Sequence, residues 1–141
     1  MAIVPRFLNL LTRYSSWELI AQMLSNMDNM NIFTSREKEA VSCLCLSMIA
    51  ADGRIDNKEI KSWNLIKDEL GIYESNIPTY SGTVVLKSLV VIKDMDYDKK
   101  VLVCQILNHL MQVDGEIDPS ELELFNMVFE SCGLKEIASR L

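Results

Sequence analysis

The octet DGRIDNKE, residues 52–59, returns as DGEIDPSE at residues 114–121 of a 141-residue chain. Both copies share the skeleton D-G-x-I-D-x-x-E, and each lies between stretches whose apolar residues recur with a helical period. The octet is therefore predicted to connect two helices. Its acidic residues raise a second question, which is whether the connection also binds a ligand.

The octets belong to a longer repeat with an offset of 62 residues, the difference between positions 114 and 52. At this offset the chain matches Lys38 with Lys100, Val41 with Val103, Asn64 with Asn126 and Gly71 with Gly133, and Trp63 falls on Phe125. The predicted unit is a helix, the D-G-x-I-D turn, a second helix and a glycine stop. It covers about residues 35–72 and again about residues 97–134.

Hydrophobic periodicity predicts an all-α fold, a compact bundle of about seven helices in a single domain over residues 1–141. Residues 1–33 are predicted to form N-terminal helices, and residues 34–134 the duplicated core. The helix at about residues 35–51 carries a wide apolar stripe and is predicted to be central. The segment TVVLKSLVVI, residues 83–92, has the β-branched content of a strand, but no second strand is available to pair with it, so a helix is predicted.

The composition is that of an ordinary globular protein, with 49% hydrophobic residues, a net charge of −6 and a pI near 4.8. This acidity argues against a nucleic-acid partner, because nucleic-acid binding requires clustered Lys and Arg. Residues 114–130 hold six acids and no Lys or Arg. Such a segment suits a cation or a basic partner, although a solvated helix face has the same composition.

The four cysteines lie among apolar residues and include no C-x-x-C pair, so they are predicted to be buried free thiols. They are Cys43, Cys45, Cys104 and Cys132. The N-terminus is a poor signal peptide, and no apolar run approaches the roughly 18 to 20 residues of a membrane span. A cytoplasmic protein without a membrane span is expected.

Each octet has the residues of a helix-to-helix corner. Gly53 and Gly115 suit the left-handed position that ends a helix. Asp56 and Asp118 are favoured N-cap residues, and Pro119 occupies the first helical position, where proline is tolerated best. Each cap stabilises its helix by about 1 kcal/mol.

The remaining positions extend the same pattern. Glu59 and Glu121 fall three residues after the caps, which gives a D-x-x-E form of the capping box. Ile55 and Ile117 precede the caps and are predicted to fold back on the core as staple residues. Helix capping therefore accounts for every patterned position of the octet except the first aspartate.

The first aspartates, Asp52 and Asp114, are not needed for capping; a short Asx-turn would account for them, and a metal site is the other interpretation. The spacing G-x₅-E matches the second half of an EF-hand loop, with Asp52 in the third acidic place and Glu59 in the last. The first two acidic places fall on Met48 and Ala50, which excludes a complete EF-hand. Calcium takes six to eight oxygens, so a site that is rich in water, or shared between both octets, remains open beside the capping interpretation.

The doubled motif resembles the TerB-like family of all-helical domains, the tellurite-resistance type. The matching stretches are AADGRIDNKE with the helix stop LGI at residues 70–72, and QVDGEIDPSE with CGL at residues 132–134. The second copy departs from the pattern at Val113 and Cys132. The resemblance covers about residues 35–134 and implies an all-α fold of two related halves.

The resemblance also implies a polar cluster that holds a divalent cation, calcium before magnesium or zinc. The ligands it implies are the six octet acids, Asp52, Asp56, Glu59, Asp114, Asp118 and Glu121. The family is associated with stress and metalloid responses, but tellurite resistance itself is not transferred to this chain.

No catalytic constellation is predicted. His109 is the only histidine and lies with Gln105, Asn108 and Gln112 on a polar stripe that is expected to face solvent. The chain lacks a G-x-S-x-G motif and a glycine-rich phosphate loop. The leading hypothesis is a non-catalytic module that binds a divalent cation and an unidentified protein partner. The alternative is a metal-free protein–protein interaction domain whose acidic turns only cap helices.

Overall fold

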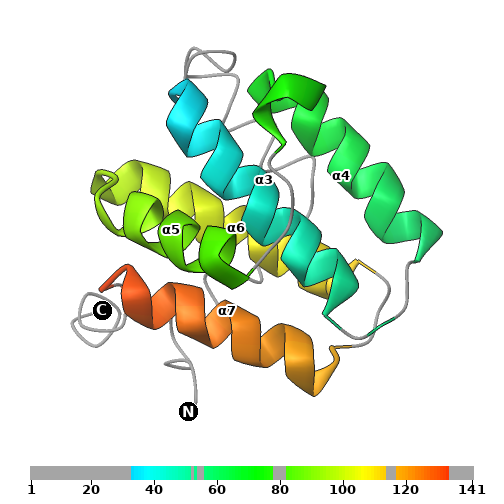
Figure 1. The fold of residues 1–141 in the computed structure, drawn as a ribbon. Helices are drawn as coiled ribbons and strands as arrows, with labels where there is room; N and C mark the ends of the chain where they lie inside the picture. Colours follow the sequence, from blue (N-terminus) through cyan, green and yellow to red (C-terminus); the bar gives the residue numbers. More distant parts are fainter. Residues whose placement is uncertain (1–32, 52, 54–55, 78–81, 114–116, 134–141) are drawn as a thin grey trace.

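The computed structural model describes residues 33–51, 53, 56–77, 82–113 and 117–133, and within these residues the fold is all-helical, with no strand (Figure 1). The elements are α3 (Ser35–Ala50), α4 (Asn57–Leu70), the short 3-10 helix η2 (Glu74–Asn76), α5 (Gly82–Lys93), α6 (Tyr97–Gln112) and α7 (Pro119–Ser131). The all-α prediction is confirmed. The described residues hold five α-helices rather than about seven, and the N-terminal helices predicted before residue 34 lie outside them.

Side-chain caps fix where α3 and α6 begin. Thr34 Oγ1 accepts a hydrogen bond from the Glu37 backbone N–H at 3.2 Å, and Glu37 Oε1 accepts one from the Thr34 N–H at 2.9 Å, so α3 starts with a complete capping box. Asp96 Oδ1 accepts from the Lys99 N–H at 3.0 Å at the start of α6. Gly71, with φ of 65°, ends α4 in the left-handed conformation that the glycine stop predicted.

Helix α3 is the central element, as its wide apolar stripe predicted. It packs most extensively against α5 and α6 and also contacts α4, α7 and η2. In Figure 1 it crosses the middle of the bundle, with α4 and α7 on opposite flanks. The most deeply buried large side chains of the core come from these helices and include Leu44, Met48, Ile66, Ile92, Ile106, Phe125 and Phe129.

The ambiguous segment at residues 83–92 is a helix. Leu89 and Ile92 of α5 face the core, while Leu86 and Val90 are 65% and 55% exposed. The Ser88 hydroxyl donates to the Val84 carbonyl at 2.7 Å, which satisfies this polar side chain within the helix itself. Packing of one face against α3 therefore overrides the β-branched propensity of the sequence.

The predicted polar surface stripe of α6 is wrong, because α6 is enclosed by its neighbours. Every residue from Leu102 to Met111 is buried, including Gln105, Asn108 and His109. His109 Nε2 lies 3.3 Å from Ser62 Oγ of α4. The prediction assumed that a polar stripe on a helix marks its solvent face. In a helix that is buried on all sides the stripe faces other helices instead, and the sequence does not distinguish the two cases.

Three of the four pairs of helix boundaries follow the 62-residue offset found in the sequence, and the fourth pair, the last residues Leu70 of α4 and Ser131 of α7, differs by 61. Helix α3 begins at Ser35 and α6 at Tyr97, a difference of 62 residues. Their last residues, Ala50 and Gln112, also differ by 62. The first residues of α4 and α7 are Asn57 and Pro119, which also differ by 62. An ion pair joins two residues at the same offset, with 2.8 Å between Lys99 Nζ and Glu37 Oε1.

The four cysteines are buried free thiols, as predicted. Burial raises the pKa of the Cys45 thiol far above its usual range. The Cys104 thiol donates a hydrogen bond to the sulfur of Cys132, which raises the pKa of Cys104 and lowers that of Cys132.

Across the described residues, no helix combines the length and apolar character needed to cross a membrane.

Candidate metal site

The first acidic corner joins α3 to α4. The backbone at Gly53 has φ of 77°, in the left-handed region that glycine adopts without steric cost. Asp56 is the N-cap of α4, and its Oδ1 accepts a hydrogen bond from the Lys58 backbone N–H at 2.6 Å. The roles of Gly53 and Asp56 in the corner are thus the predicted ones.

The second acidic corner joins α6 to α7. Asp118 Oδ1 accepts from the Ser120 backbone N–H at 2.8 Å, and Glu121 Oε1 accepts from the Asp118 N–H at 3.3 Å. Asp118 and Glu121 form the predicted capping box, and Pro119 occupies the first helical position. Ile117 is 48% exposed, so its prediction as a staple residue on the core is wrong.

The third helical residue of α4 and of α7 is a buried glutamate. Glu59 and Glu121 are each 1% exposed, although both belong to octets with the composition of a solvated turn. Burial of a carboxylate is costly unless hydrogen bonds or a cation compensate it. The two corners therefore place a carboxylate below the surface at equivalent positions.

Four of the six predicted ligands are described by the structure. Asp56 with Glu59 stands at the start of α4, and Asp118 with Glu121 at the start of α7. The other two, Asp52 and Asp114, lie outside the described residues, as do Ile55 and Gly115. Within the described part of the chain, no three His, Cys, Asp or Glu side chains gather closely enough to hold a metal ion. The complete six-carboxylate set thus stays a prediction.

The two corners lie on the same side of the bundle. The last residues of α3 and α6 and the first residues of α4 and α7 all lie in the right half of Figure 1. Carboxylate oxygens are ligands that calcium prefers, and an ionised carboxylate has roughly four acceptor sites. A carboxylate that caps a helix with one oxygen therefore retains the capacity to coordinate a cation.

Sequence reasoning missed a group of buried polar residues on α6, of which His109 contacts Ser62 of α4. Besides the contact of His109 with Ser62, Gln112 Nε2 donates to Asn108 Oδ1 at 2.7 Å. Asn108 is fully buried, and Gln105 is 3% exposed. The only sequence signal was their helical spacing, which is the same for a buried stripe and for a solvated one.

No protein-family model matches the chain, and neither a curated protein nor a solved structure is similar to it at a significant level. The TerB-like resemblance therefore rests on the repeated motif.

Proposed function

We propose that this protein is a non-catalytic TerB-like module whose two acidic corners bind a divalent cation, calcium before magnesium or zinc, and which engages a protein partner in the cytoplasm. The observation that carries the proposal is the burial of Glu59 and Glu121, each 1% exposed. Each of these glutamates is three residues from an aspartate cap, and the octet begins with a further aspartate. Each corner thus contributes three carboxylates, and a calcium shell needs six to eight oxygens.

The proposal includes a duplicated core, which is what would bring the two corners together. The coincidence of helix boundaries at an offset of 62 supports it. So does the ion pair of Glu37 with Lys99, because two equivalent residues contact each other only near a two-fold axis that relates their units. A pseudo-two-fold axis next to α3 and α6 would place both corners at one end of the bundle.

The second candidate function is a metal-free interaction domain, and the helix caps favour it. Asp56 and Asp118 both accept backbone hydrogen bonds, at 2.6 and 2.8 Å, so their presence needs no cation. Under this alternative, the acidic corners define the geometry of the bundle, and its surface alone carries the function.

Calcium titration of the metal-stripped protein separates the two candidates. A cation that binds only the native state at 100 times its Kd stabilises that state by about 2.7 kcal/mol, which corresponds to a rise in Tm of roughly 10 °C for a chain of this size. We expect this rise in the unmodified protein. We expect none in the double variant Asp56→Asn/Asp118→Asn, in which asparagine keeps the caps but removes two charges.

The matched control is Asp96→Asn. Asp96 caps α6 through the same kind of hydrogen bond but belongs to neither octet, so its variant should keep the full calcium response. If neither calcium, magnesium nor zinc changes the Tm, and calorimetry detects no heat of binding at millimolar concentration, the cation proposal fails and the metal-free domain stands. Equal loss of the response in the control would mean that the Asp→Asn effect is not specific to the corners.

A further inference from the structure

The outward face of α5 is an apolar ridge. Leu86 and Val90 are one helical turn apart and are 65% and 55% exposed, and the sequence of the helix contains no acidic residue. Most exposed apolar side chains occur singly and need no explanation. Two neighbours on one helix, next to hollows on both sides, form a continuous surface of the kind that binds partners.

A groove runs along each side of this ridge. The first, of about 430 Å³, lies between α3 and α5 and is lined by Arg36, Ala40, Val84, Lys87 and Val91, among others. The second, of about 660 Å³, lies between α5 and α7 and includes Leu89, Lys93, Lys100 and Cys132 in its lining. Val90 lines both grooves, so the ridge separates two hollows that are largely apolar.

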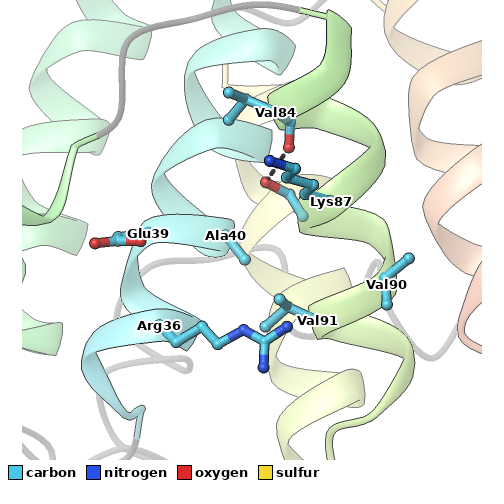
Figure 2. Close-up of a pocket in the computed structure, with 8 residues that line it drawn as sticks. Arg36, Glu39, Ala40, Val84, Lys87, Val90 and Val91 are labelled. Carbon is cyan, nitrogen blue, oxygen red and sulfur yellow. Dashed lines mark hydrogen bonds between the residues drawn. The ribbon is translucent and has the colours of Figure 1, made fainter.

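The rim of these grooves is basic, in contrast to the chain as a whole. Figure 2 shows Arg36 reaching from α3 towards Val91 of α5, while the side chain of Glu39 points away from α5. Lys87 adds a second cation to the first groove, and the second groove has two lysines against a single acid, Glu130. The net charge of the protein is −6, so this face is a local concentration of positive charge.

We propose that the ridge and grooves of α5 bind an amphipathic helix of a partner protein, with an apolar stripe flanked by acidic residues. Apolar side chains of such a helix, spaced at i, i+3, i+4 and i+7, would enter the grooves on either side of Leu86 and Val90. Its carboxylates would pair with Arg36, Lys87 and Lys93. This inference names the surface of the protein-binding half of the proposed function and rests on that half.

Other occupants fit the same face less well. A second copy that docked through its own α5 would place Lys87 and Lys93 against like charges. An anionic membrane would meet a chain with an overall charge of −6, and it is flat where this surface is grooved. An acidic helix satisfies both the shape and the charge.

The test uses two synthetic helical peptides of about 18 residues, roughly 27 Å long, with the same leucine stripe and either Glu or Lys on the flanks. Binding to the full chain is measured by fluorescence anisotropy at low and high salt. We expect the Glu peptide to bind at least about tenfold more tightly than the Lys peptide, a difference of about 1.4 kcal/mol, and we expect salt to reduce this difference. The double variant Lys87→Glu/Lys93→Glu should reverse the preference.

Leu86→Ser and Val90→Ser should each weaken the Glu peptide about tenfold without changing the Tm, because both side chains are exposed. The matched control is Leu65→Ser, since Leu65 is 50% exposed on α4 and lines neither groove. Amide chemical shifts in the bound state should change along α5 and the facing residues of α3 and α7.

Several results would overturn the inference. They are equal binding of both peptides, no binding of either at millimolar concentration, binding to anionic vesicles that depends on Leu86, or a dimer that dissociates in Leu86→Ser. A large loss of stability in Leu86→Ser would show that another part of the same chain already covers the ridge. Calcium titration of Leu86→Ser distinguishes the two proposals. If only the peptide-binding proposal is wrong, calcium still raises the Tm; if only the cation proposal is wrong, the Glu peptide still binds.

Discussion

The ion pair between Glu37 and Lys99 yields a quantitative prediction about the contact of α3 with α6. Glu37 Oε1 accepts from two donors, the Thr34 backbone N–H at 2.9 Å and Lys99 Nζ at 2.8 Å. Replacement by alanine removes both interactions. The two side chains are 15% and 24% exposed, so their ion pair belongs at the upper end of the range for surface pairs, about 0.5 to 1 kcal/mol.

Three substitutions separate these contributions. Glu37→Gln keeps an acceptor for the Thr34 N–H and removes the charge, so it should cost only the ion pair, about 0.5 to 1 kcal/mol. Lys99→Met should cost the same, because the backbone N–H of residue 99 still donates to Asp96. Glu37→Ala should cost about 2 kcal/mol, since the capping interaction contributes about 1 kcal/mol more.

Urea unfolding of the single and double variants measures the coupling. We expect an interaction energy of at least about 0.5 kcal/mol between positions 37 and 99, which falls in 1 M salt, where the screening length is about 3 Å. A coupling energy of zero, or one that is insensitive to salt, would refute the ion pair as a stabilising contact. It would also remove the support that this contact gives to a pseudo-two-fold axis.

Four shorter predictions follow from the caps, the core and the thiols. Asp118→Ala should lower the free energy of unfolding by about 1 kcal/mol and Asp118→Asn by a few tenths, measured without metal. Phe125→Ala should cost about 3 to 5 kcal/mol in chemical denaturation, because Phe125 is fully buried and stacks on Phe129 at 6.2 Å between ring centroids. Gly133→Ala should cost about 1 kcal/mol in the same assay, through its φ of 72° rather than through a clash, since no atom lies within 4 Å of the added Cβ. Cys132 lines a groove and its pKa is lowered, so iodoacetamide should modify Cys132 before Cys45, and the rate of modification should rise at a lower pH than for an ordinary thiol. Peptide mass mapping identifies the modified residue, and modification of Cys45 first would contradict the prediction.

The sequence predicted the helices and corners of the described core because their signals are local. A cap such as Asp56, a stop such as Gly71 and a proline at the first helical position act through neighbouring backbone atoms, so a short stretch of sequence contains the whole interaction. The helix at residues 82–93 was harder to predict, since its propensity favours a strand and its packing against α3 is non-local. Only the helical spacing of Val85, Leu89 and Ile92 and the lack of a partner strand indicated a helix.

Burial of polar residues was not predictable by the same reasoning. His109 and Asn108 have the spacing of a solvated face, and Glu121 has the position of an exposed cap, yet all three are buried. Their burial depends on which helices cover α6 and α7, and the period of a single helix carries no information about its neighbours. The ligand set has the same limit, because convergence of Asp56 with Asp118 depends on the relative placement of two hairpins.

The central position of α3 bears on how the chain unfolds. Although α4 follows α3 in sequence, α3 packs more extensively against α5 and α6 than against α4. We therefore expect the pair of α3 and α4 to lose most of its packing when α6 and α7 are removed, so that the two predicted repeat units depend on each other. The described core should unfold cooperatively in a single transition, and a break in the chain between α4 and α5 should leave fragments that fold only when they are mixed.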